Sequence, residues 1–244
     1  MAVARRHDGR RANQSRPVKI TPDFVRTADG SCLIELGGTR VICTASLAAG
    51  VPAWRTGSGL GWVTAEYGML PAATGSRRNR PIGKADSRAV EIQRLIGRTL
   101  RNVVRFDRLG ENTLTLDCDV LEADGGTRTA AITGAYVALA MAVRRGAAQR
   151  RCPATALRGA VAAVSVGIVD GRALLDLDYA EDSTAEVDMN IAMMRGGKFV
   201  EIQGSSERQA FDMAQLDAML ALARRGINAL LRVQQQALAK GRKR

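Results

Sequence analysis

Acidic side chains gather in one short segment of this chain. Six carboxylates lie there: Asp176, Asp178, Glu181, Asp182, Glu186 and Asp188. The chain of 244 residues carries a formal net charge of +12, so this acidity is local. Converging carboxylates repel each other unless a cation neutralises them, or unless one keeps a proton and acts as a general acid. Mg²⁺ prefers such ligands, often one or two carboxylates with waters and substrate phosphates. The alternative is an acidic loop whose members pair with nearby arginines.

A second candidate site is the run Asp-Gly-Gly-Thr-Arg-Thr at residues 124–129. A strand-like segment ends there and a helical pattern begins at Thr127. The first N–H groups of a helix attract anions, and Gly125 and Gly126 would let a ligand approach the backbone closely. The Thr127 hydroxyl and the Arg128 guanidinium add donors, so the run predicts a phosphate site. The alternative is a tight turn with an ordinary threonine N-cap.

Further basic groups lie upstream. Arg88 begins a predicted helix, where its charge opposes the helix dipole unless an anion lies nearby. Arg77, Arg78 and Arg80 lie in a glycine- and proline-containing loop at 71–86, which we expect to be mobile and to hold nucleic-acid phosphates without reading bases. Solvated surface charge is the alternative for all four arginines.

Composition narrows the chemistry. Lys and Arg number 36 against 24 Asp and Glu, which favours a polyanionic partner such as nucleic acid. The one histidine, His7, lies in an irregular arm over residues 1–16 that we expect to be flexible, so a Ser-His-Asp triad and a histidine-rich metal site are excluded. The four cysteines lack CxxC spacing and are predicted to be buried free thiols, which is typical of a cytoplasmic protein. The sequence has no apolar stretch that predicts a membrane span or a secretory signal.

Strand-like and helical segments follow one another in two halves, which predicts an α+β fold. Glycine-containing turns predict hairpins around residues 37–38, 170–171 and 196–197. The pattern of apolar residues predicts helices over 87–102 and from 127 to a stop at Gly146. A capping box at Asp212 and Gln215 begins a long C-terminal helix. Residues 174–179 alternate, which would place Asp176 and Asp178 on one face of a strand, with Asp182 and Asp188 in the extended or looped segment after it.

Four long segments resemble the ribonuclease PH family closely: LDLDYAEDSTAEVDMN, LEADGGTRTAAITGAY, ADSRAVEIQRLIGR and the pair RPVKITPDFV and GSCLIELGGTRVICTA. The resemblance runs from about residue 10 to residue 235. It implies a core domain similar to domain 2 of ribosomal protein S5 over residues 1–152, including the basic arm, and a smaller C-terminal α+β domain over 153–244. It also implies a homohexamer built as a trimer of dimers.

The resemblance implies a chemistry as well. Members of the family are phosphorolytic 3′→5′ exoribonucleases that trim tRNA precursors, release nucleoside 5′-diphosphates with inorganic phosphate and can run in reverse. By resemblance, Arg88 and the loop of Gly126, Thr127 and Arg128 bind phosphate, while Asp182 and Asp188 match the metal and general-acid positions. We expect Asp188 to hold Mg²⁺ or another divalent cation and Asp182 to be a second ligand or the acid. Arg77, Arg78 and Arg80 would hold the tRNA backbone.

Two other functions would use parts of the same pattern. A non-catalytic ring subunit would bind RNA but would be expected to lack the acidic pair or the phosphate loop. A hydrolytic, metal-dependent nuclease would use the carboxylates without an anion pocket at 126–128. The presence of both features favours the phosphorolytic enzyme.

Overall fold

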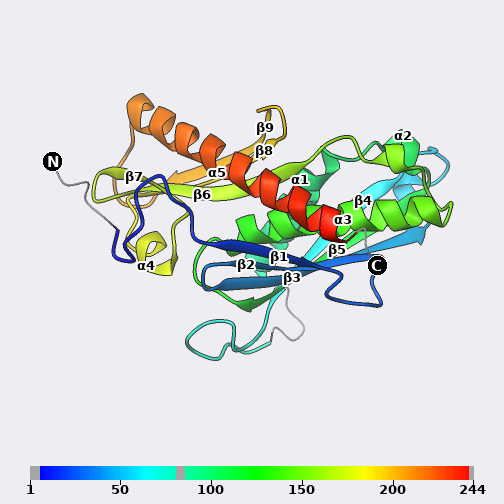
Figure 1. Ribbon diagram of the computed structural model, residues 1–244, viewed down its shortest axis with the longest axis horizontal. Coiled ribbons are helices and arrows are strands. Elements are labelled where there is room, and N and C mark those ends of the chain that lie inside the picture. The colour runs from blue at the N-terminus through cyan, green and yellow to red at the C-terminus, as the bar shows by residue number, and fades with distance from the viewer. Residues whose placement is uncertain (1–5, 81–85, 242–244) are drawn as a thin grey trace.

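The structure is a computed structural model that describes residues 6–80 and 86–241. Within these residues the strands form two sheets (Figure 1), ordered β1-β2-β3-β5-β4 and β7-β6-β8-β9. The first comprises β1 (Val18–Pro22), β2 (Gly30–Leu36), β3 (Thr39–Ala49), β4 (Trp62–Met69) and β5 (Asn112–Glu122). The second comprises β6 (Val161–Val169), β7 (Arg172–Leu175), β8 (Val187–Met194) and β9 (Phe199–Ser206). Paired strands are antiparallel except β4 and β5, which are parallel. The α+β prediction and the three hairpins are confirmed.

Helix α3 (Thr127–Ala148) packs against β2 and β3 of the first sheet and against β6 of the second. Its small residues permit close approach to the sheets. A Cβ added to Gly134 would lie 2.7 Å from Cys43 Sγ, and one added to Gly146 would lie 2.6 Å from Leu47 Cδ2. The predicted stop at Gly146 is therefore wrong, since this glycine lies inside the helix and serves packing.

Helix α5 (Met213–Lys240) packs against β1, β6 and β7. The predicted capping box forms: the Asp212 carboxylate accepts the Gln215 N–H at 2.9 Å, and Gln215 Oε1 accepts the Asp212 N–H at 3.0 Å. The larger of the two buried clusters in the described residues takes members from both halves of the chain. The expected boundary between residues 152 and 153 falls in the connection from α3 to β6 and stays a prediction. None of the described helices is long and apolar enough to cross a membrane.

Helix α1 (Ser87–Arg101) packs on β4 and matches the predicted helix over 87–102. The Asp86 carboxylate caps it by accepting the N–H groups of Arg88 and Ala89. The short helices η1 (Ala53–Arg55), α2 (Phe106–Leu109) and η2 (Ala154–Ala156) were not predicted, because one helical turn leaves no periodic pattern to detect.

The four cysteines are free and buried, as predicted. Cys32, Cys43 and Cys118 face each other across β2, β3 and β5. Their thiols contact carbonyl oxygens of α3, which places them in the core between the first sheet and that helix.

The acidic segment does not form the strand predicted over residues 174–179. Strand β7 ends at Leu175, and Asp176 adopts a left-handed backbone with φ of 57°. Asp178 is the N-cap of a one-turn helix, α4 (Tyr179–Asp182), in a capping box with Glu181. Asp176 and Asp178 therefore do not share a strand face. Asp182 ends α4, and Asp188 lies within β8. Asp178 and Glu181 have the D-x-x-E spacing of a capping box and begin a helix, although the alternating pattern predicted a strand.

The N-terminal arm is irregular from residue 6 to residue 16, but it is not the flexible segment expected. Arg6, Arg10 and Arg16 are buried, with exposed fractions of 5%, 6% and 6%. Their ion pairs with the acidic segment hold the arm against the body. In the basic loop, residues 71–80 have no helix or strand, as predicted, and residues 81–85 lie outside the described residues.

Candidate active site

A cavity of roughly 630 Å³ lies where segments from both sheets meet. Every phosphate-binding and acidic residue expected from the sequence lines it: Arg88, Gly126, Thr127, Arg128, Asp182 and Asp188. These residues come from α1, from the start of α3, from α4 and from β8. Residues far apart in the sequence thus line one cavity.

The anion-binding part is built by the turn between β5 and α3. Gly125 and Gly126 both adopt left-handed backbones, with φ of 71° and 66°, which favours glycine. Gly126 is the N-cap of α3 and supplies no side-chain cap, so no side chain there covers the positive end of the helix. Thr127 is the first residue of the helix, and the alternative of a threonine N-cap is wrong. The turn leaves an anion-binding helix start open toward the cavity.

The Thr127 hydroxyl is oriented by a neighbour from β4. Tyr67 donates its phenolic hydrogen to Thr127 Oγ1 over 3.0 Å. Since that bond occupies an acceptor site of Thr127, the threonine proton can point elsewhere, toward a ligand. Burial raises the pKa of Tyr67, while its bond to Thr127 and the charges of Arg88 and Arg128 oppose that rise. The charges of both arginines are therefore felt at Tyr67, beside the start of α3.

Arg88 and Arg128 differ in how firmly they are held. Arg88 is exposed in the first turn of α1, where the Asp86 cap offsets the unfavourable placement of its charge. The side chain of Arg128 is 16% exposed and lies 3.7 Å from the Glu91 carboxylate. It also donates to Gln203 Oε1 at 3.5 Å, a long hydrogen bond. An anion in the cavity would meet one exposed guanidinium, that of Arg88, and one partly anchored guanidinium, that of Arg128.

The two cavity carboxylates have raised pKa values. Burial, together with repulsion from Asp182, raises the pKa of Asp188 to about 6, against the opposing effects of Arg128 and Asn190. Burial also raises the pKa of Asp182, while Arg128 and Arg88 lower it. Each of the two carboxyls therefore holds a proton more readily than an exposed aspartate does.

One oxygen of Asp188 fits a cation ligand. Its Oδ2 accepts a hydrogen bond from Asn190 Nδ2 at 3.3 Å. Its Oδ1 is buried and has no hydrogen-bond partner among the described residues. A buried acceptor left without a partner is costly, and a divalent ion held by Asp188 and Asp182 would satisfy it. A second group, His7, Asp178 and Glu181, also has ligand atoms within 4.8 Å of one another, but arginines already pair with its carboxylates.

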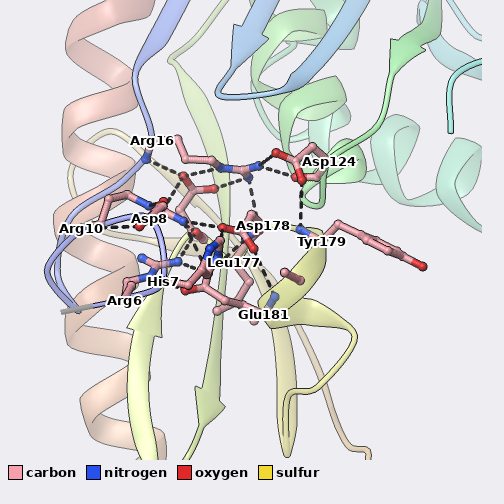
Figure 2. A network of polar contacts seen from close by, with 12 residues as sticks. Arg6, His7, Asp8, Arg10, Arg16, Asp124, Leu177, Asp178, Tyr179 and Glu181 are labelled. Atoms are coloured by element: carbon pink, nitrogen blue, oxygen red, sulfur yellow. Dashed lines mark hydrogen bonds and ion pairs between the residues drawn. The ribbon is translucent and has the colours of Figure 1, made fainter. Parts of the chain in front are cut away.

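The acidic segment is thus divided between two tasks, and Figure 2 shows the part that pairs with arginines of the N-terminal arm. Asp176, Asp178 and Glu181 are buried and pair with arginines of the N-terminal arm. Asp182 and Asp188 line the cavity instead. Each of the two explanations left open by the sequence, arginine pairing and cation binding, fits a different part of the segment.

The basic loop reaches the site in part. Arg78 lines the main cavity, and it lines a neighbouring cavity of about 330 Å³ together with Arg80 and Arg88. Arg77 lines neither cavity and donates to Asn79 Oδ1 at 3.0 Å on the surface. The structure brings Arg78 and Arg80, but not Arg77, close to the residues expected to bind phosphate.

Sequence reasoning missed three residues of the site. Tyr179 lines the cavity with 66% of its surface exposed, and its ring points away from the arginine network (Figure 2). Ser165 lines the cavity and accepts the Leu177 N–H at 3.1 Å. Tyr67 orients Thr127. The capping box Asp178-x-x-Glu181 was a signal that could have placed Tyr179 at a helix start, whereas nothing local marks the other two.

Two family models match the sequence. The 3′ exoribonuclease family, domain 1, matches residues 14–144, and domain 2 of the same family matches residues 159–226. The chain is also 55% identical over 235 residues to a ribonuclease PH from Corynebacterium efficiens, covering 96% of each chain.

Solved structures share the fold at low sequence identity. Rice (Oryza sativa) Rrp46 matches with a TM-score of 0.78 and 17% identity, over 96% of this chain and 100% of its own. A chain of the Archaeoglobus fulgidus exosome with RNA bound to the active site matches with a TM-score of 0.80 and 22% identity, over 93% and 92%. A chain of an archaeal exosome core matches with a TM-score of 0.73 and 21% identity, over 96% and 91%. These likenesses concern the fold alone.

Proposed function

The chain belongs to the 3′ exoribonuclease family, and from this premise we propose how its cavity removes nucleotides from RNA 3′ ends. It is a phosphorolytic 3′→5′ exoribonuclease of the ribonuclease PH type. In the reaction, an oxygen of inorganic phosphate attacks the phosphorus of the terminal phosphodiester. The bond from that phosphorus to the 3′ oxygen of the preceding nucleotide breaks, a nucleoside 5′-diphosphate leaves and the new 3′ oxygen takes a proton. Nucleotide addition from diphosphates is the reverse.

The proposed phosphate site is the start of α3. The N–H groups at Thr127 and beyond, the Thr127 hydroxyl and the guanidinium groups of Arg88 and Arg128 all line the cavity or open toward it. Together they offer both neutral and charged donors to a small anion. Holding phosphate beside the RNA end removes much of the entropic barrier to a reaction between two molecules.

The proposed metal ligands are Asp188 and Asp182. Magnesium, when bound there, would neutralise negative charge on the scissile phosphate. The unpartnered Asp188 Oδ1 supports its assignment as a ligand. Asp182 would be a second ligand or the group that protonates the departing 3′ oxygen, and its raised pKa suits the latter role.

The proposed RNA contacts lie around the cavity. Arg78 and Arg80 would contact backbone phosphates, and this binding would depend little on sequence. The exposed Tyr179 ring would stack on a base near the 3′ end. A tRNA precursor with a short 3′ extension is the proposed substrate.

The proposed assembly is a homohexamer, a trimer of dimers. Its support is the family resemblance together with an edge strand: among the described residues β9 ends the second sheet, and its Phe199 and Ile202 are 36% and 49% exposed. Light scattering should give six times the 26.1 kDa chain mass, and a monomer in solution would contradict this part. We place the protein in the cytoplasm, because its four free cysteines suit a reducing compartment.

The observation that carries the function is that one cavity holds both an anion-binding helix start and a pair of carboxylates with raised pKa values. The test is product identity: Mg²⁺ and a tRNA with a short 3′ extension are incubated with and without inorganic phosphate. Nucleoside diphosphates released only with phosphate are expected. Monophosphates released without phosphate would mean a hydrolytic nuclease, and tight RNA binding without release would mean a non-catalytic subunit.

A further inference from the structure

The N-terminal arm joins the two halves of the candidate active site through Arg16. The guanidinium of Arg16 lies between two chain segments that follow different sheets, as Figure 2 shows. On one side, Arg16 Nη1 donates to the backbone oxygen of Asp124, just before the phosphate-binding turn. On the other side, Nη2 donates to Asp176 Oδ1 at 2.6 Å and to the Leu177 carbonyl at 3.2 Å, and Nε donates to Asp176 Oδ2 at 3.1 Å.

This bridge is buried and closely fitted. Arg16 is 6% exposed and Asp176 is 1% exposed. A Cβ added to Gly126 would lie 3.2 Å from Arg16 Nη2, so the guanidinium packs directly behind the turn that opens α3. The Arg16 backbone N–H also donates to Asp176 Oδ2 at 2.7 Å, which fixes the arm at the same point. A paired and hydrogen-bonded buried charge is much more costly to break than to keep.

The segment beyond Asp176 needs such support. Helix α4 is only four residues long and ends at Asp182. One isolated helical turn is unstable in water, so tertiary contacts must hold α4 in place. Arg6 donates to the Leu175 carbonyl at 2.6 Å and pairs with Glu181, while Arg10 donates to Asp178 Oδ2 at 3.1 Å. The arm therefore holds both the start of α4 and the residues before it.

Asp124 strengthens the same link from the other sheet. Its Oδ1 accepts the backbone N–H of Tyr179, the first residue of α4, at 3.3 Å, and its Oδ2 lies 3.7 Å from Arg16 Nη1. Gly125 packs tightly on α4, since an added Cβ there would lie 2.7 Å from the Asp178 carbonyl carbon. The phosphate-binding turn and α4 thus contact each other directly. Arg16 is bonded to Asp124, which precedes the turn, and to Asp176 and Leu177, which precede α4.

We infer that Arg16 is a positioning residue for the reaction: it sets the placement of the phosphate-binding turn at 125–127 relative to the acidic segment that ends at Asp182. This inference rests on the proposed function, which assigns phosphate to the first segment and the metal or acid to the second. Arg16 itself does not line the cavity and touches no reacting group. Its loss should let the turn and α4 move apart, so that phosphate is held less well and less often in line with the RNA end.

The test is the Arg16→Lys variant, which keeps the positive charge but cannot reach Asp124 and both oxygens of Asp176 together. We expect the KM for phosphate to rise at least five-fold and kcat to fall at least ten-fold, with the Kd for RNA within two-fold of the wild-type value. The rise in KM is the decisive readout, because a loss of folded protein lowers apparent kcat without changing KM. Arg11→Lys is the matched control, since Arg11 lies in the same arm with an exposed side chain.

Asp124→Ala provides a second variant, which leaves Arg16 paired with Asp176 and therefore leaves no buried charge unpaired. It removes the Tyr179 contact and should raise the KM for phosphate in the same direction, at least two-fold. If either folded variant keeps the wild-type KM for phosphate while the wild-type enzyme is phosphorolytic, the inference is wrong. If the wild-type enzyme itself releases nucleotides without phosphate, the proposed function is wrong instead. The wild-type reaction without phosphate therefore distinguishes a failure of the proposed function from a failure of the inference on Arg16.

Discussion

Tyr67 and Thr127 are joined by a buried hydrogen bond of 3.0 Å that links strand β4 to the first residue of helix α3. The bond connects β4, which pairs in parallel with β5, to the turn at the start of α3. It fixes the rotation of the one hydroxyl among the proposed phosphate ligands. The precision of the phosphate site therefore depends on a residue that does not itself line the cavity.

Replacing Tyr67 by Phe should weaken phosphate binding without changing the fold. The variant removes one hydrogen bond and leaves the ring, so the KM for phosphate should rise about five-fold, which corresponds to about 1 kcal/mol. The KM for RNA should not change. Tyr136→Phe is the matched control, since Tyr136 is equally buried, on α3, but lines a different cavity. Steady-state kinetics with varied phosphate measure the effect, and equal values for both variants would contradict it.

Arg88→Ala and Arg128→Ala should each lower kcat/KM for phosphate by about 100-fold or more, because each removes a charged donor from the anion site. RNA binding should survive in part, since the RNA contacts proposed for Arg78 and Arg80 are left in place. Arg94→Ala is the control, because Arg94 is exposed on the same helix as Arg88 but does not line the cavity. Phosphate-dependent release of diphosphates and a filter-binding assay give the two readouts. If both variants kept wild-type kcat/KM for phosphate, the anion would have to bind elsewhere.

Asp188→Asn should abolish activity yet stabilise the metal-free protein near neutral pH. The folded protein raises the pKa of Asp188 to about 6 from 3.8, so the folded state binds the proton more tightly than the unfolded state. The contribution of protonated Asp188 to the free energy of unfolding is fully present below pH 3.8. It is lost as the pH rises through about 6. At pH 7.5 the neutral Asn side chain should therefore add about 1–2 kcal/mol to the free energy of unfolding, measured in EDTA.

The matched control for that experiment is Asp178→Asn, which should act in the opposite direction. Burial of Asp178 acts to raise its pKa, but hydrogen bonds from the Glu181 backbone and His7 and the charge of Arg10 outweigh burial and lower it. Its charged form therefore stabilises the folded state above the ordinary pKa of aspartate, and that stability is lost as pH falls through the lowered pKa. Denaturant unfolding at pH 7.5 should show a less stable variant. The same sign for both variants would refute the assignment of the two carboxylates to different tasks.

Local patterns predicted the parts of this molecule that local forces determine. The hairpin turns, the helix at 87–101 and the capping box at Asp212 are set by glycine, periodicity and neighbouring side chains, and each was confirmed. The meeting of Arg88, the 126–128 turn and the acidic pair in one cavity was expected only through the family resemblance, because no local pattern encodes contacts between sheets.

The largest error concerned residues 6–16, where many charges and no periodicity predicted a flexible arm. The charge of Arg16 is neutralised by Asp176, 160 positions along the chain, and a pairing at that distance leaves no trace in the sequence of the arm itself. Together with the pairs Arg6–Glu181 and Arg10–Asp178, this pairing accounts for three of the six carboxylates in the acidic cluster. The capping box of Asp178 and Glu181 was readable, but the strand-like alternation of the same residues concealed it.

Tyr179 should contribute to RNA binding through its ring alone. The residue is 66% exposed and lines the same cavity as Asp182 and Asp188, where an aromatic face can stack on any base. Tyr179→Ala should raise the KM for RNA roughly ten-fold, in line with about 1–3 kcal/mol for a stacked base. Tyr179→Phe should keep the wild-type value, because stacking needs no hydroxyl. The KM for phosphate should be unchanged in both, since the backbone N–H of residue 179, and not its ring, donates to Asp124. A rise in the RNA KM of the Phe variant equal to that of the Ala variant would show that the hydroxyl, and not stacking, makes the contact.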